Sequence, residues 1–199
     1  MEIFIIGLVI FFSIHSIAIL GSLKEILIDK IGDLIYKVVF SIGSAIGLLL
    51  VIYGYAELRS NGTGNEIFWV TSTWMKHFVL LSMLPSSIFI VAAYIPSRIT
   101  KFVRHPMLVA IKIWASSHLI VNGDLASIIL FSSFLCFAVI DIMSLKKRSG
   151  GVFPTTNFLC NKYSGLIGDV AVISTGLILY MFMLFYGHYW LVGVTLLNG

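Results

Sequence analysis

The sequence predicts an all-α integral membrane protein, a bundle of about six transmembrane helices that forms one domain over residues 1–199. Three observations predict this class, and the first is composition. Hydrophobic residues make up 59% of the chain and charged residues only 11%, whereas soluble domains are about one quarter charged. The mean hydropathy is +1.03. This composition excludes a water-exposed globule, a disordered chain, a disulfide-rich secreted scaffold and a conventional nucleic-acid-binding protein, and it makes the lipid bilayer a partner.

Six uncharged or nearly uncharged stretches are the second observation. Crossing a hydrocarbon layer of ~30 Å takes about 20 apolar residues in a helix. The first stretch follows Met1 and Glu2 directly, without the basic segment of a cleavable signal peptide, so we expect a retained span. The fourth stretch contains Lys112, and the fifth is short. The expected helices cover residues 3–23, 38–56, 77–97, 105–121, 125–140 and 170–187.

The distribution of basic residues is the third observation, and it predicts the orientation. Ten of the thirteen lysines and arginines fall in the first, third and fifth connections between the expected helices. Connections rich in Lys and Arg stay on the cytoplasmic side of a membrane, so both chain termini are expected on the non-cytoplasmic side. The ten residues are Lys24, Lys30, Lys37, Arg98, Lys101, Arg104, Lys146, Lys147, Arg148 and Lys162.

Small residues in the second expected helix predict a close helix contact. Gly43 and Gly47 are four residues apart, and Gly54 lies on nearly the same face. Such a face lets the backbone of another helix approach closely. We therefore expect residues 38–56 to pack tightly against a neighbouring helix.

Histidines are the unusual feature of so apolar a chain. His15 and His118 fall inside expected helices, His77 and His105 at the start of two others, and His188 at the end of the last. Ionisable side chains at membrane depth are costly and usually face a bundle interior or a cavity, where they have a function. The alternative for the two internal residues is a structural histidine that is hydrogen-bonded to a nearby carbonyl or serine.

Two histidines from different helices can hold an iron atom. Neutral imidazole is a good ligand for iron, copper or zinc, and a pair can clamp a haem inside a helix bundle. His105 and His118 are 13 residues apart, which is about 20 Å along a helix, so these two cannot bind the same iron. We predict His15 and His118 as the metal ligands. Similar depth in the membrane would favour His15 with His105 instead, and both pairs stay open.

Other polar residues near these histidines are candidates for binding the same cofactor. Lys112 either reaches the cytoplasmic surface or holds a haem propionate or an acidic headgroup. Asn122 lies one turn beyond His118 and is expected to contact it. Arg104 and His105 either begin a helix beside lipid phosphate and loop carbonyls or belong to the cofactor site. No catalytic residue can be assigned from the sequence.

Several short strings carry a resemblance to a known family. They are spread over nearly the whole chain and are densest between Arg98 and Ser127. On these strings the chain resembles the NnrU family of bacterial inner-membrane proteins, and the regions around His15 and His188 fit as well. The strings are Gly54-Tyr55, Leu84-Pro85, Ala92-Ala93-Tyr94-Ile95-Pro96, Arg104-His105-Pro106-Met107-Leu108, Lys112-Ile113-Trp114-Ala115, His118-Leu119 and Asn122-Gly123-Asp124-Leu125-Ala126-Ser127.

The resemblance implies a multi-pass protein of the bacterial inner membrane that is linked to denitrification and nitric oxide metabolism. A relative of the family, the 15-cis-zeta-carotene isomerase, is a membrane enzyme that carries haem b, and its histidines line up with His15, His105 and His118. The resemblance therefore implies haem b as cofactor and a carotenoid-like polyene as a candidate ligand. Ala115 replaces a cysteine of the isomerase, and Ala110 replaces a common glycine. The first change removes a thiolate ligand but leaves bis-histidine binding.

Three functions are consistent with these residues. The first is a haem-binding membrane protein, either an isomerase-like enzyme that acts on a hydrophobic polyene or an accessory protein in nitric oxide metabolism. The second is a non-catalytic assembly factor that contacts subunits of a respiratory nitrogen-oxide reductase. The third is a membrane methyltransferase that uses S-adenosylmethionine, because Arg104-His105-Pro106 is similar to a motif of those enzymes. The residues that follow depart from that motif, and no glutamate occurs after Glu66.

Overall fold

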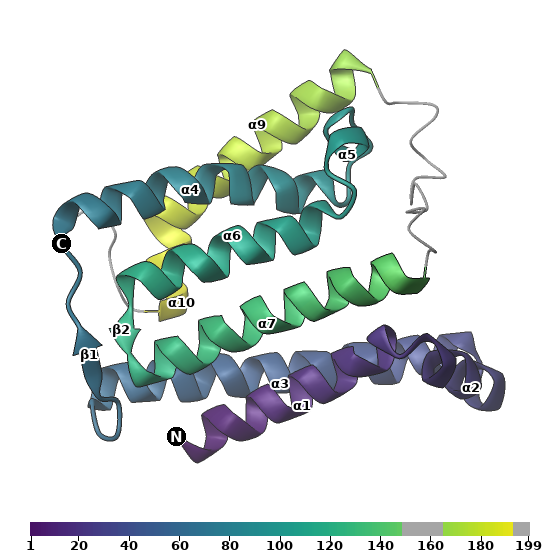
Figure 1. The fold of residues 1–199 in the computed structure, drawn as a ribbon, viewed down its shortest axis with the longest axis horizontal. Helices are drawn as coiled ribbons and strands as arrows, with labels where there is room; N and C mark the ends of the chain where they lie inside the picture. The colour runs from purple at the N-terminus through teal and green to yellow at the C-terminus, as the bar shows by residue number, and fades with distance from the viewer. Residues whose placement is uncertain (149–164, 193–199) are drawn as a thin grey trace. The chain divides into compact units, whose positions relative to one another are not determined.

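The computed structural model describes residues 1–148 and 165–192. The chain separates into two compact units, Met1–Glu66 and Ile67–Gly199, which are described one at a time as the N-terminal and the C-terminal unit. Helices dominate both units (Figure 1). Lys162, one of the residues behind the orientation prediction, lies outside the described residues.

The N-terminal unit is a helical hairpin with a short helix at its bend. Its long apolar helices are α1 (Glu2–Ile19) and α3 (Asp33–Asn61), and α2 (Gly21–Ile31) connects them. Gly32 stands between α2 and α3 with φ +84°, a conformation that residues with a side chain rarely adopt. The sequence predicts no helix in this basic connection, because α2 mixes apolar and charged residues and is too short to form a span.

Helices α1 and α3 pack antiparallel along the predicted glycine face. A Cβ atom added at Gly54 would lie 2.6 Å from the backbone nitrogen of Phe4, and one at Gly47 would lie 2.8 Å from that of Phe11. Real Cβ atoms essentially never come so close to another backbone, so only glycine allows this approach. The expected tight contact of residues 38–56 with a neighbouring helix is confirmed.

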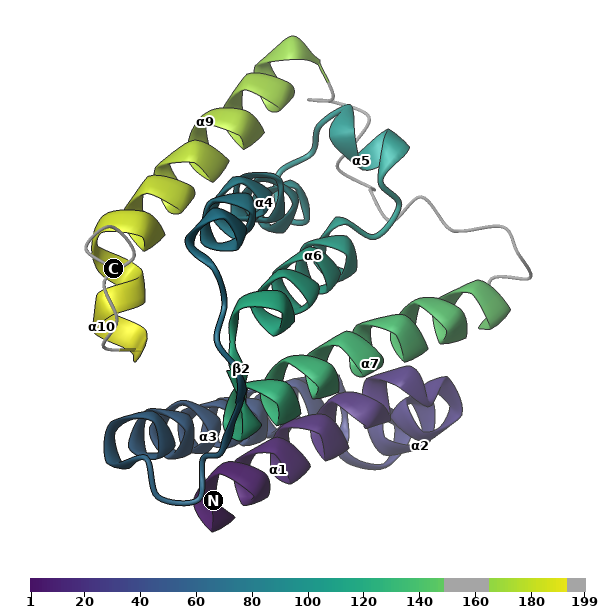
Figure 2. The same cartoon turned by 60° about the vertical axis from the view of Figure 1, so that its left-hand side comes forward.

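The C-terminal unit is built around a row of helices. Figures 1 and 2 show α9, α4, α6 and α7 side by side in that order, so α6 lies between α4 and α7. The elements of the unit are β1 (Ile67–Trp69), α4 (Thr73–Ala92), α5 (Ile99–Phe102), α6 (Pro106–Val121), β2 (Gly123–Asp124), α7 (Leu125–Arg148), α9 (Leu166–Phe182), the π-helical turn η1 (Met183–Gly187) and α10 (His188–Val192).

Small and polar side chains hold α4 against α6. The Ser82 and Ser117 hydroxyl oxygens are 2.8 Å apart, and the Ser86 hydroxyl donates to the Ala110 carbonyl at 2.9 Å. Serine hydrogen bonds and small residues are the usual means by which apolar helices associate in a membrane. Ala110 itself is fully buried, so it belongs to this contact.

Five of the described helical segments are long and apolar enough to cross a membrane, whereas α6, at 16 residues, is shorter. Together they correspond to the six predicted stretches, but the six-span count and the orientation stay predictions. The all-α prediction misses a small antiparallel sheet in which β1 pairs with β2. The expected helix at 125–140 continues to Arg148. The prediction ends it too early, because its last turn contains Lys146, Lys147 and Arg148, and a search for apolar residues does not include a charged turn.

Candidate functional site

Helix α6 carries most of the residues that the sequence predicts for a site. His105 immediately precedes the helix, and His118 lies in its last turn. The helix is continuous between them, so the two imidazoles lie at opposite ends of one element, about 20 Å apart along its axis. The structure therefore agrees that these two histidines do not share a ligand.

The His118 imidazole has a fixed orientation. Its Nδ1 atom lies 2.9 Å from the Trp114 carbonyl oxygen one turn earlier. A carbonyl oxygen can only accept, so Nδ1 carries the proton and Nε2 keeps its lone pair. The ring packs against the Phe131 ring of α7 at a centroid distance of 4.8 Å and against the Trp114 indole at 5.4 Å. This arrangement presents Nε2 as a metal ligand in aromatic surroundings.

A clasp formed by β1, the segment after it and β2 fixes the end of α6 beside His118. The Trp69 indole N–H donates to the Ile120 carbonyl at 3.2 Å, and the Thr71 hydroxyl donates to the Val121 carbonyl at 3.0 Å. A Cβ atom at Gly123 would collide with Trp69, so the tight approach of the two strands requires glycine. The clasp satisfies carbonyl groups that a helix end otherwise leaves open.

Asn122 completes this helix end. Its side-chain amide donates to the backbone carbonyl of His118 at 3.0 Å, and a contact that orients the imidazole stays a prediction. This hydrogen bond is to the backbone. Asn122 therefore stabilises the last turn of α6 and supports His118 through the main chain.

His188 is a second histidine of the C-terminal unit that the sequence prediction does not pair with His118. It begins α10, in the same compact unit as α6. Both histidines fall near the ends of expected helices. The C-terminal unit thus contains one histidine in the last turn of α6 and one at the start of α10.

His15 repeats the arrangement of His118 in the N-terminal unit. Its Nδ1 atom lies 2.9 Å from the Phe11 carbonyl oxygen one turn earlier. The ring stacks on Phe11 at 4.1 Å and lies 5.2 Å from the Phe40 ring of α3. His15 and His118 belong to different units, so their pairing as metal ligands stays a prediction.

Arg104 and His105 line a cavity of about 210 Å³ at the start of α6. Burial lowers the pKa of His105, Arg104 lowers it further, and the Asp141 carboxylate of α7 opposes this shift. Lys112 does not line the cavity and is half-buried farther along α6. The lining residues are Ala92, Ala93, Thr100, Arg104, His105, Pro106, Met107 and Leu108.

The residues of 1–148 and 165–192 contain no group of three or more His, Cys, Asp or Glu side chains that could hold a metal ion. A site that uses protein side chains for most of its coordination sphere is therefore not found in that part of the chain. A haem would need only one or two imidazoles from the chain.

Apolar helices of membrane-crossing length, with histidines inside them, define the class as an integral membrane protein with imidazoles in its helix bundle. The model of the family described as NnrU protein matches residues 3–196, and the chain belongs to the NnrU family. The resemblance seen in the short strings is confirmed. The match runs through both compact units. No curated protein and no solved structure matches the chain.

Proposed function

We propose that this member of the NnrU family binds haem b and that Nε2 of His118 is an iron ligand. The observation that carries the proposal is the hydrogen bond from Nδ1 of His118 to the Trp114 carbonyl at 2.9 Å. Histidines that bind metals almost always donate their other ring N–H to such an oxygen, which fixes the tautomer and raises the basicity of the ligating nitrogen.

The surroundings of His118 are aromatic and apolar. Phe131 and Trp114 contact the imidazole, and the Trp114 indole packs edge-on against Phe131 at 5.0 Å. Ala115, one turn before His118, is fully buried, so the residue that replaces the isomerase cysteine supplies no thiolate. These residues fit an imidazole ligand in an apolar, aromatic setting.

The second imidazole is supplied by His15 or by His188. His15 is the residue predicted from the sequence, and its Nδ1 atom lies 2.9 Å from the Phe11 carbonyl oxygen, as Nδ1 of His118 does from that of Trp114. His188 is the alternative because it belongs to the same compact unit as His118. Variants of the two residues separate these possibilities.

Bound haem would supply an iron centre that changes oxidation state and ligation. The chain would hold it: Trp114 orients His118, and Phe131 limits the access of water. Lys112 precedes His118 by six residues, about 9 Å along the helix, and would be the residue that pairs with a propionate. By resemblance, the site serves nitric oxide metabolism in denitrification or the isomerisation of a polyene, in a bacterial inner membrane.

The test is haem titration of the purified protein in detergent, followed by its oxidised and reduced absorption spectra. We expect a Soret band with a defined end point, and His118→Ala should abolish it or shift it strongly. Whichever of His15→Ala and His188→Ala shifts the band identifies the second ligand. His77→Ala is the matched control, because His77 is exposed in the first turns of α4. A band that His118→Ala leaves unchanged would contradict the proposal.

The two other functions predicted from the sequence stay alternatives. No contact in the described residues favours a reductase assembly factor, whose test is co-purification with reductase subunits. The cavity beside Arg104 and His105, about 210 Å³, is smaller than the roughly 300–1,000 Å³ typical of sites for larger organic ligands. It therefore speaks against S-adenosylmethionine at this motif, which calorimetry would test directly.

A further inference from the structure

The short helix α2 lies at the bend of the N-terminal unit, where α1 ends and α3 begins (Figure 1). The backbone leaves helical geometry at Leu20, with φ −85° and ψ 79°, and again at Gly32, with φ 84° and ψ 152°. These two breaks let α2 take a direction of its own. Its 11 residues cover about 16 Å, which is too short to cross a hydrocarbon layer. No haem ligand proposed above lies in α2, so its role is independent of haem.

The first turns of α3 extend past the end of α1, to the level of α2. A Cβ atom at Gly43 would meet the Ile14 side chain, so these two residues are at the same level of the hairpin. From there α1 continues to Ile19, about 7.5 Å, and α3 reaches back to Asp33, about 15 Å. The extension carries the ion pair of Lys37 with Asp33, whose side chains are 66% and 57% exposed. Exposed charges at this level place α2 at a membrane surface and not within the hydrocarbon.

Charged and apolar residues occupy different faces of α2. A helix turns about 100° per residue, so Lys24 and Lys30 lie about 60° to either side of Leu27, whereas Glu25 and Asp29 lie about 160° from it. A lysine beside an apolar face can lay its aliphatic stem along that face and hold its ammonium group at the headgroups. All apolar residues of the helix lie within about 100° of Leu27, and they are Leu23, Ile26, Leu27, Ile28 and Ile31.

The apolar face of α2 is open. No residue of this helix is buried, and Leu23, Ile26 and Ile31 are 39%, 50% and 38% exposed. An amphipathic helix normally covers its apolar face, either with the rest of the protein or with lipid. Both neighbours of α2 along the chain are helices long and apolar enough to cross a membrane. Lipid is therefore the cover that is already present at both ends of α2.

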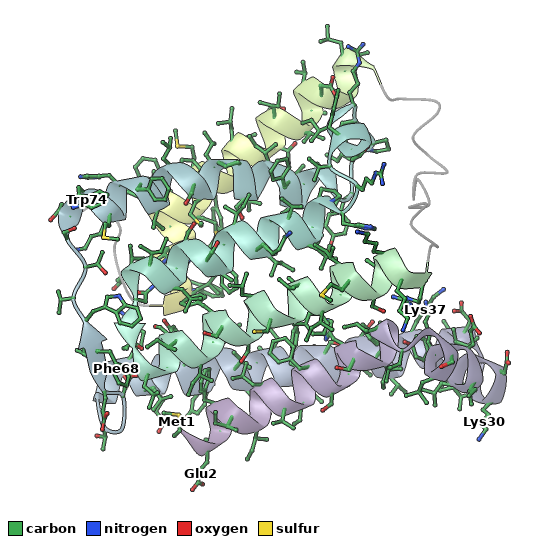
Figure 3. The ribbon with its side chains drawn as sticks, viewed as in Figure 1. Met1, Glu2, Lys30, Lys37, Phe68 and Trp74 are labelled. Atoms are coloured by element: carbon green, nitrogen blue, oxygen red, sulfur yellow. The ribbon has the colours of Figure 1, made fainter. Side chains whose placement is uncertain are left out.

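The two carboxylates of α2 require water on the opposite side. Glu25 and Asp29 are exposed and one turn apart, a spacing at which like charges repel each other unless water screens them. The two acidic and two basic side chains of α2 cancel, so attraction to an anionic surface depends on where the charges lie. Lysines beside the apolar face would be at that surface, and the carboxylates about a helix diameter, ~10 Å, farther into the screening salt solution. Figure 3 shows the Lys30 side chain extending outwards from the bend.

We propose that α2 is an interfacial helix that binds the surface of the membrane crossed by α1 and α3. Its apolar face lies between the headgroups and the acyl chains, and Lys24 and Lys30 bind phosphate groups of anionic phospholipids. The carboxylates of Glu25 and Asp29 face water. Bound in this way, α2 fixes the depth of the bend of the hairpin in the membrane.

Spin labels on the two faces of α2 test this position. The full chain, with Cys136 and Cys160 replaced by serine, carries one label at Leu23→Cys or at Glu25→Cys and is reconstituted into vesicles of phosphatidylcholine with phosphatidylglycerol. The two residues are exposed and on opposite faces, so they form a matched pair. We expect the label at residue 23 to be accessible mainly to oxygen, which concentrates in lipid, and the label at residue 25 mainly to a water-soluble nickel chelate.

Replacing the lysines tests the contact with anionic headgroups. We expect the label at residue 23 to lie deeper in vesicles with phosphatidylglycerol than in vesicles of phosphatidylcholine alone. Lys24→Gln combined with Lys30→Gln should abolish this difference. Lys146→Gln combined with Lys147→Gln is the matched control, because it removes the same charge from exposed residues at the end of α7 and should leave the difference intact.

Three results would overturn the proposal. Equal access of the nickel chelate to both labels would mean that the apolar face of α2 is in water. Protection of residue 23 from both reagents would mean that protein, either a partner or a second copy of the chain, covers the face. A label depth that does not respond to phosphatidylglycerol, or an equal loss in the two lysine pairs, would exclude binding of anionic headgroups by Lys24 and Lys30.

Discussion

His105 shows how one residue can couple the C-terminal unit to pH. Burial and the neighbouring Arg104 lower its pKa from the ordinary value of 6.5, and Asp141 opposes them. The unfolded chain therefore binds a proton at His105 at a higher pH than the folded protein does. Between the two pKa values the unfolded state holds more protons, so the free energy of unfolding rises with pH.

We expect the Tm of the protein to fall as the pH is lowered from 7 through 6, and His105→Asn to reduce this fall. Differential scanning fluorimetry in detergent over a series of buffers measures it. His77→Asn is the matched control, since His77 is an exposed histidine. An identical pH profile for the parent and His105→Asn would show that His105 does not contribute.

The sequence was most informative about single polar residues inside apolar helices, because burying an unpaired polar group costs free energy and therefore requires a partner or a function. An imidazole inside an apolar helix has to be satisfied, and both His15 and His118 use a carbonyl one turn earlier. It was less informative about how His188 lies relative to His118, because a relation across helices depends on packing that spacing along the chain does not encode. The cavity beside Arg104 was likewise not predictable, since α4, α5 and α6 build it together.

At the scale of elements, the close α1–α3 contact predicts how much stability is lost when its glycines are replaced by alanine. Gly54→Ala forces a methyl group to within 2.6 Å of the Phe4 backbone and should destabilise the protein by about 1–3 kcal/mol. In Gly43→Ala the new methyl group meets only the terminal carbon of the Ile14 side chain, which can rotate away, so little loss is expected. Equilibrium unfolding of both variants in mixed detergent tests the difference, and equal stability would contradict the packing.

The limits of prediction at this scale have a physical cause. Apolar stretches predict the long helices because lipid requires them, but α2 is mixed in polarity and the sheet of β1 and β2 is very short. Such elements are selected by tertiary contacts, here the bonds of Trp69 and Thr71 to the end of α6. Local patterns therefore do not reveal them.

At the scale of the molecule, the orientation in the membrane is the prediction to test. In the N-terminal unit, Lys30 and Lys37 lie at one end of the hairpin and Met1 and Glu2 at the other (Figure 3). Large apolar side chains are widely exposed on the described helices, as expected for a surface that contacts lipid. Basic connections on the cytoplasmic side would place both termini on the opposite side.

Reporter fusions at both termini and in the connections test this orientation. We expect alkaline phosphatase to be active at each terminus and a fluorescent protein to be dark there, with the reverse in the connection after α1. Termini on opposite sides would mean that α6, with only 16 residues, does not span the bilayer. The same experiment therefore tests the six-span count, which helix length by itself leaves as a prediction.

The central claim, that Nε2 of His118 binds haem iron, is tested most directly by chemical rescue. His118→Gly removes the side chain, and free imidazole added to the haem-loaded variant can take its place. We predict that the variant has an altered Soret band and that imidazole restores the spectrum of the parent protein, while the same addition leaves His77→Gly unchanged. A His118→Gly variant whose spectrum already equals that of the parent without imidazole would contradict the claim.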